Sequence, residues 1–253
     1  MENSFADVPY KLMHYGNKNL QTQEHLEMMI MCSSPGVMDD DSLSVKIHCK
    51  EGASMKLFTQ SYGKLHPMTK GARQSTQVKT EPRSLLCYIP QPVTPFKNSL
   101  FHASAEIKTD ETSHLIWGDI ISGGRIHSGE RFEFTKIHNQ TKLYINNELI
   151  FYDNQLLEPL TQPIEGVLFF EGYSHQGTLL LVSREAGKFK NELDEMLKEQ
   201  FVDMQYGFTQ CHKNALVIKM LGNSGEAVHS LMSHLGNMFW SFIKYRNGEL
   251  KSK

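Results

Sequence analysis

Carboxylates on or beside expected strands are the side chains of this chain with the clearest chemical potential. Three consecutive aspartates, Asp39 to Asp41, follow the turn-forming run Ser34-Pro35-Gly36. Five further carboxylates lie in or beside strand-like segments: Glu106, Asp119, Glu130, Asp153 and Glu171. Two carboxylates that converge on one cleft can act as a general acid–base pair, and carboxylate oxygens can hold a divalent cation. The spacing does not force such convergence, and a solvated turn is the alternative for the three aspartates.

Histidine and cysteine are the usual ligands of tightly bound transition metals. The chain has 12 histidines and 4 cysteines. Helical metal pairs sit at i,i+4 and strand pairs at i,i+2, because those spacings place both imidazoles on one face. No two histidines have either spacing, and no cysteines form a CxxC pair. Histidines distant in sequence could still converge, but surface or hydrogen-bonded structural roles explain each one. The cysteines are typical of small core residues in a reducing compartment.

The segment Gly172-Tyr173-Ser174-His175-Gln176-Gly177 resembles a nucleophile elbow. Its second glycine is one position too far, and an elbow must be followed directly by a helix. The following residues, 178–182, have the composition of a strand. We therefore interpret the segment as a hairpin loop, and the chain has no phosphate-cradling glycine loop that would indicate nucleotide hydrolysis.

Charge and hydropathy exclude two classes of partner. The 26 basic and 28 acidic side chains give a formal charge of -2, and the basic-leaning segment 66–83 has no aromatic residue to stack on bases. Nucleic acid is therefore not an expected partner. No run of 18 apolar residues predicts a membrane span, and the N-terminal residues do not have the pattern of a signal peptide. We expect a cytoplasmic protein.

Strands must position these side chains, because period-two alternation dominates the chain. Residues 44–50 and 101–108 alternate apolar and polar side chains, as half-buried strands do. Residues 143–145 and 149–151 flank Asn146-Asn147, which tolerates the positive φ angles of a hairpin turn. Residues 167–170 and 178–182 predict another strand pair, and the proline-rich segment 90–95 predicts a turn or a sheet edge.

The pattern becomes helical after Ser183, which is a plausible N-cap. Apolar residues at helical spacing predict a helix over 184–200, a strand-like run returns over 205–221, and a second helix is predicted over 225–245. With about 40% hydrophobic residues, the chain can bury a sizeable core. We predict one domain over 1–253, strand-rich from about residue 8 to 222.

Several segments, in order along residues 9–182, resemble motifs of the urease accessory protein family UreD, called UreH in some bacteria. The most specific match is Trp117-Gly118-Asp119, followed by Gly124-Arg125 and Gly129-Glu130-Arg131-Phe132. The other similar segments are Pro9-Tyr10-Lys11-Leu12-Met13, Ser34-Pro35-Gly36-Val37-Met38 leading to Asp41, residues 59–66, residues 90–96, Tyr152-Asp153-Asn154 and residues 170–175.

Two departures from the family pattern concern acidic positions. Asp39-Asp40 stand where the family commonly has glycines, which changes the backbone requirements of the turn. Asp119 stands where many members have glutamate, so its carboxylate is one methylene shorter.

The resemblance implies a mainly β, β-helix-like fold with two helices in the C-terminal region. It implies a non-catalytic scaffold that binds the accessory protein UreF, through it the GTPase UreG, and apo-urease, as a dimer of heterodimers or a larger complex. No tightly bound cofactor is expected. The resemblance implies instead that Ni²⁺ passes transiently along a tunnel in the protein. For that path we select Asp41, Glu106, Asp119 and Glu130 as contacts.

Two other classes of function stay open at the level of sequence. One is a metal-dependent enzyme on a cupin-like or β-sandwich scaffold, and the other is a carbohydrate- or peptide-binding β-module. An enzyme should hold a stoichiometric metal in a deep pocket with perturbed titrating groups, whereas a scaffold should expose large apolar or charged patches.

Overall fold

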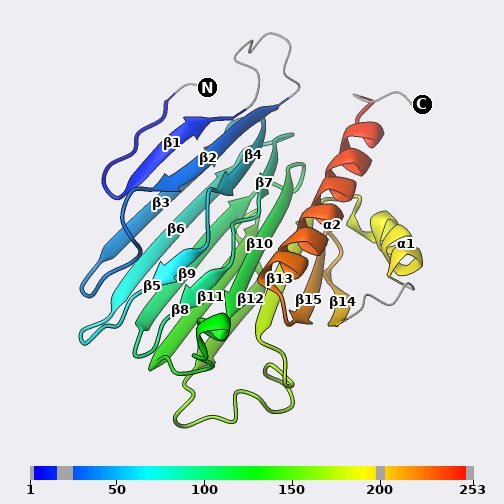
Figure 1. Ribbon diagram of the computed structural model, residues 1–253. Coiled ribbons are helices and arrows are strands. Elements are labelled where there is room, and N and C mark those ends of the chain that lie inside the picture. Colours follow the sequence, from blue (N-terminus) through cyan, green and yellow to red (C-terminus); the bar gives the residue numbers. More distant parts are fainter. Residues whose placement is uncertain (1–2, 16–24, 198–202, 249–253) are drawn as a thin grey trace.

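The computed structural model describes residues 3–15, 25–197 and 203–248, which form two stacked β-sheets and two α-helices (Figure 1). Sheet A has ten strands, and sheet B has five. The main path of sheet A is β1 (Tyr10–His14), β2 (Leu26–Cys32), β4 (Ser54–Thr59), β7 (Leu85–Tyr88), β10 (His114–Ser122), β13 (His175–Val182), β15 (Ala215–Gly222) and β14 (Met204–His212). The short strands β5 (Gly63–Leu65) and β8 (Val93–Pro95) complete sheet A.

Sheet B is ordered β12 (Glu148–Leu157), β11 (Lys136–Ile145), β9 (Leu100–Thr109), β6 (Ala72–Thr80) and β3 (Ser42–Cys49). Between β3 and β11 the chain alternates between the sheets, so β3, β6, β9 and β11 stack in parallel in sheet B. In the same way β4, β7 and β10 stack in parallel in sheet A. This winding confirms the predicted mainly β, β-helix-like fold.

The alternation read from the sequence determines which face each strand buries. In β3, Leu43, Ile47 and Cys49 point inward while the side chains between them are exposed or half-buried. The hairpin predicted at Asn146-Asn147 is also confirmed: it joins β11 to β12, and both asparagines have positive φ. The proline-rich segment ends in β8, which pairs with β5 and β10.

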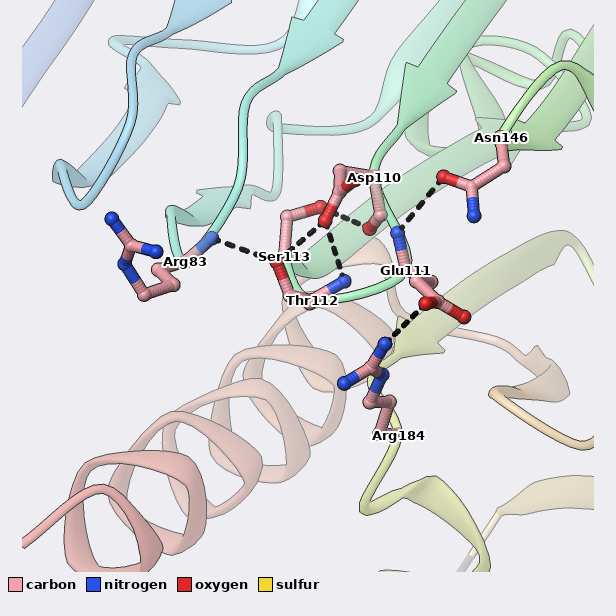
Figure 2. A network of polar contacts seen from close by, with 7 residues as sticks. All are labelled: Arg83, Asp110, Glu111, Thr112, Ser113, Asn146 and Arg184. Carbon is pink, nitrogen blue, oxygen red and sulfur yellow. Dashed lines mark hydrogen bonds and ion pairs between the residues drawn. The ribbon is translucent and has the colours of Figure 1, made fainter.

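The turn between β9 and β10 is held by its own side chains, as Figure 2 shows. The Asp110 carboxylate accepts from the backbone N–H of Thr112 at 2.7 Å, and the Ser113 hydroxyl donates to the Asp110 carbonyl at 2.7 Å. Thr112 Oγ1 accepts from the backbone N–H of Arg83 at 3.2 Å. The neighbouring turns of the solenoid are therefore joined at this end of the sheets.

Two predictions made from the sequence, a strand over 167–170 and an N-cap at Ser183, are wrong. Residues 167–170 form turns rather than a strand, because Phe170 anchors the loop in the core while Val167 and Leu168 are 79% and 90% exposed. Ser183 is not the N-cap: α1 (Ala186–Met196) begins after Glu185, and the Ser183 hydroxyl accepts from the Glu185 N–H at 3.0 Å instead.

The helices match their predicted places with adjusted ends. The last predicted residues of the first helix, 198–200, lie outside the described residues. The strand-like run over 205–221 is the hairpin of β14 and β15. The second helix, α2 (Gly225–Arg246), begins after Ser224, whose side chain accepts from the Ala227 N–H.

Both helices pack on the outer face of sheet A, away from sheet B (Figure 1). Helix α2 lies against β10, β13 and β15, and Phe239 and Phe242 of α2 pack with Phe189 of α1. Across the described residues, no helix has the length and apolar character needed to cross a bilayer.

Candidate functional site: a polar layer between the sheets

A cavity of about 260 Å³ lies between the two sheets, lined by strands of both. Apolar clusters lie on either side of it. One is built around Ile107, Trp117 and Leu143, and the other around Phe101 and Ile137. Apart from Leu43 and Val45 of β3, which continue the same rows, the inward residues between these clusters are polar or small, and we call the polar ones the polar layer. Its members are Gln74, Thr76, Asp119, Asn139, Thr141, Asp153, Gln155, Gln176, Thr178 and Lys219.

Strand register assembles this layer. In sheet B, Gln74, Ala103, Asn139 and Gln155 are successive register partners, and the next inward row is Thr76, Ala105, Thr141 and Asp153. In sheet A, Asp119, Thr178 and Lys219 form the facing row. Alternation keeps the side chains of each row on one face, so the two sheets present polar groups to each other.

Asp119 is the carboxylate of the layer that lines the cavity. The side-chain amide of Asn139 donates to Asp119 Oδ2 across the sheets. Burial raises the pKa of Asp119, while this hydrogen bond and the Lys219 charge act in the opposite direction. The indole Nε1–H of Trp117, which also lines the cavity, has no hydrogen-bond partner among the described residues. A buried unpaired donor indicates that the cavity accommodates water or another acceptor.

The two ends of the layer differ in charge. At one end, Lys219 Nζ contacts Asp153 Oδ2 and donates to Thr178 Oγ1 at 2.9 Å. At the other end, the Tyr10 hydroxyl donates to Gln74 Oε1 at 3.0 Å, and burial raises the pKa of Tyr10 to about 12. Asp41 lines the cavity at this second end and accepts from the Met38 N–H at 2.7 Å.

The structure brings two of the four carboxylates selected from the sequence to the cavity. Asp41 and Asp119 line it. Glu106 does not: it lies on the outer face of sheet B and pairs with Lys108 at 2.8 Å.

Glu130 also lies outside the cavity lining, in an ion pair with Arg125. Arg125 Nε donates to Glu130 Oε2 at 2.8 Å, and this hydrogen bond holds the pKa of Glu130 below its usual range. The neighbouring Arg131 pairs instead with Glu165.

The turn at 39–41 is largely solvated, which is the alternative given in the sequence analysis for its three aspartates. Asp39 Oδ1 accepts from the backbone N–H groups of Lys70 and Gly71, each at 2.9 Å, and Asp40, at positive φ, pairs with Lys70.

Reasoning from sequence missed Gln74, Asn139 and Lys219. A signal was present in β11, where Asn139 and Thr141 interrupt the inward apolar series of Ile137, Leu143 and Ile145. Polar residues at inward positions of a strand indicate a polar interior once the parity of the strand is known.

The other chemical motifs of the sequence have structural environments. Ser174 is buried and bonds to His175 Nδ1 at 2.8 Å, and strand β13 follows directly where an elbow would need a helix. Burial lowers the pKa of His175 to about 4. Within the described ranges, no three His, Cys, Asp or Glu side chains are grouped as metal ligands would be.

Comparisons with known proteins agree with the motif resemblance. The family model described as UreD urease accessory protein matches residues 1–246. Urease accessory protein UreD of Acetivibrio thermocellus is 32% identical over 253 residues, covering 95% of this chain and 91% of that protein. The UreD of Flavobacterium johnsoniae is 28% identical, with coverages of 95% and 87%. Urease accessory protein UreH of Helicobacter hepaticus is 27% identical, with coverages of 89% and 86%.

Proposed function

Because this chain belongs to the UreD urease accessory protein family, we propose that it is a non-catalytic scaffold of urease maturation whose inter-sheet cavity conducts Ni²⁺ toward the enzyme. The cavity is the observation that carries this proposal. It lies between the sheets, and Gln74, Thr76, Asn139 and Thr141 of the polar layer line it. Carboxylates from two distant segments, Asp41 and Asp119, line it as well.

The chemistry of the layer suits transient rather than permanent binding of nickel. Carboxylate, amide and hydroxyl oxygens hold Ni²⁺ less tightly than imidazole or thiolate groups do, because affinity for nickel rises with nitrogen and sulfur donors. A carried ion must also leave, so an oxygen-lined path favours release. Asp41 and Asp119 are the carboxylates proposed to contact the ion, and Glu106 and Glu130 are omitted because both are engaged in ion pairs away from the cavity.

The proposed partners are UreF, UreG acting through UreF, and apo-urease, in the cytoplasm. An accessory protein must contact the enzyme it matures, and an ion conducted to that enzyme must be handed over where the two proteins meet. The specific contact with UreF should bury more than about 1,000 Å² in total, as stable interfaces do.

Nickel delivery through the cavity can be tested with Asp119→Asn. This change keeps the shape of the side chain and removes its charge, so assembly with UreF should be unaffected. Delivery of nickel to apo-urease should be slower by about tenfold, the scale on which altered metal environments act. The measurement is nickel per urease active site against time, with UreF, UreG and GTP present.

Two matched changes serve as controls for this test. Asp194→Asn removes an exposed carboxylate on α1, and Glu130→Gln removes the carboxylate paired with Arg125. Both complexes should deliver nickel at the wild-type rate. Full delivery by Asp119→Asn, with normal assembly, would exclude Asp119 from the route.

A further inference from the structure

The outer face of sheet B is an open sheet surface: within the described residues, the helices pack on sheet A instead (Figure 1). Strands β3, β6, β9 and β11 pair in parallel and in register, so their outward side chains form rows across the face. Parallel sheets usually have both faces covered by other elements. An open parallel face is therefore a candidate contact surface.

The outward side chains of these four strands are mostly hydrophilic. Most of those that carry a charge are cations. Serine, glutamine, histidine and lysine occupy most of the outward positions. The cations are Lys46, Arg73, Lys79, Lys108, Lys136 and Lys142, and Glu106 is the carboxylate among them. The whole chain carries more acidic than basic residues, so this face has the opposite sign to the molecule.

Much of this positive charge is not neutralised within the described residues. Glu106 pairs with Lys108 at 2.8 Å, Lys136 pairs with Glu158 at 2.9 Å, and Lys79 lies 3.7 Å from Glu81. By contrast, no described carboxylate forms an ion pair with Lys46, Arg73 or Lys142. Arg73 Nε donates to Ser42 Oγ, and the Lys142 ammonium lies over the Tyr152 ring. These three cations can therefore bind carboxylates from outside.

One end of the face is hollowed. The hollow has a volume of about 390 Å³, and the charged and imidazole side chains in its lining are Lys70, Arg73, Lys136, Asp40, Asp41, His102 and His138. Asp40 is paired with Lys70. The two imidazoles stack with their centroids 4.7 Å apart, and each Nε2 contacts a side-chain amide oxygen. A guanidinium beside a hollow of this size offers a position for a carboxylate side chain, which arginine binds in a bidentate manner.

We propose that the outer face of sheet B docks an acidic surface of a protein partner, an inference that rests on the proposed function in urease maturation. The four strands present Tyr144 as their outward aromatic, which is too little for the base stacking that single-stranded nucleic acid requires. Leu100, half-buried at the start of β9, is their one outward aliphatic side chain, and a single such residue is too little to insert into a bilayer. A contact made by lysine and arginine around a polar sheet is electrostatically steered, so it forms fast and weakens with salt.

The double variant Lys46→Glu/Lys142→Glu tests this surface. Its matched control is Lys11→Glu/Lys213→Glu, which changes the net charge equally at exposed sites on β1 and in the β14–β15 turn. Association rates with purified UreF and with apo-urease are measured at low and at physiological salt. The face variant should associate about tenfold more slowly with one of these proteins at low salt, with a flatter salt dependence, while the control stays within about twofold of wild type.

Equal rates for the face variant and the control, with both proteins, would overturn the proposal. A duplex DNA and anionic phosphatidylserine vesicles are assayed in parallel, and selective loss of either interaction in the face variant with unchanged protein association would overturn it too. Circular dichroism checks folding, and Lys46→Gln/Lys142→Gln, which introduces no repulsion with Glu106, should give an intermediate rate. If the wild-type chain binds neither UreF nor apo-urease, the proposed function is refuted. If the wild-type chain binds and the face variant associates at the same rate, only this docking surface is refuted.

Discussion

At the scale of single residues, burial of the Asp119 carboxylate lowers the stability of the fold, and the same carboxylate is proposed to contact Ni²⁺. Its carboxylate faces a cavity rather than bulk solvent, and burial raises its pKa. A folded state that binds its proton more tightly than the unfolded state loses stability as pH rises above the ordinary carboxyl range. The hydrogen bond from Asn139 and the nearby charge of Lys219 act to lower the pKa, against the effect of burial.

Asp119→Asn should remove this loss of stability. Near pH 4, about the ordinary pKa of an aspartate, the variant and wild type should have similar free energies of unfolding. Near pH 8 the variant should be more stable, by on the order of 1 kcal/mol, because no charge is buried. Urea unfolding at the two pH values measures the difference, and a variant that is less stable at the higher pH would show that the ionised carboxylate is favoured by its surroundings.

At the scale of elements, glycines determine how closely α2 approaches sheet A. A Cβ added at Gly118 would lie 2.7 Å from Met232 Sδ and 3.1 Å from Ile89 Cγ2. A Cβ at Gly177 would lie 2.9 Å from Val228. The glycine of the Trp117-Gly118-Asp119 motif thus has a packing function on the helix side, while its neighbours point between the sheets.

Gly118→Val should therefore destabilise the fold by roughly 1–3 kcal/mol, the usual range for overpacking a core. Gly207→Val is the matched control, because Gly207 lies in strand β14 with no atom within 4 Å of an added Cβ. There valine should be neutral or slightly stabilising, since β-branched residues suit strands. Thermal unfolding of both variants measures the effect, and equal midpoints would mean that α2 shifts without loss of packing.

At the scale of the whole molecule, sheet A is continuous and side-chain contacts tie sheet B to it. The hydrogen-bonded path of sheet A runs from β1 to β14, and the polar layer joins it to sheet B through Asp119–Asn139, Gln155–Gln176 and Asp153–Lys219. The apolar clusters on either side of the layer share strands β9, β10 and β11. Neither cluster can lose its strands without disrupting the other.

We therefore expect the chain to unfold as a single domain. Calorimetry should show one transition, with a calorimetric enthalpy close to the van't Hoff enthalpy. Two separable transitions, or a protease-resistant fragment ending between β10 and β13, would divide the chain into independent units instead.

The sequence alone determined the strands around 44–50, 101–108 and 178–182, the Asn146-Asn147 turn, the second helix and the family motifs, because each depends on residues close together in the chain. Side-chain period identifies the buried face of a strand, and turn residues indicate where it ends. The same local rules misplaced 167–170, whose apolar composition matches a strand although two of its residues face solvent.

Only the tertiary structure decided which polar residues meet. Asp119 reaches Asn139 on another sheet, and Lys219 reaches Asp153 although 66 positions separate them. Alternation shows that each of these residues points inward, but it does not show which strand lies opposite. That depends on the order and register of strands in both sheets, and a shift of one residue would turn each side chain to the other face. For the same reason Glu106 and Glu130, which we selected from the sequence together with Asp41 and Asp119, lie in ion pairs outside the cavity lining.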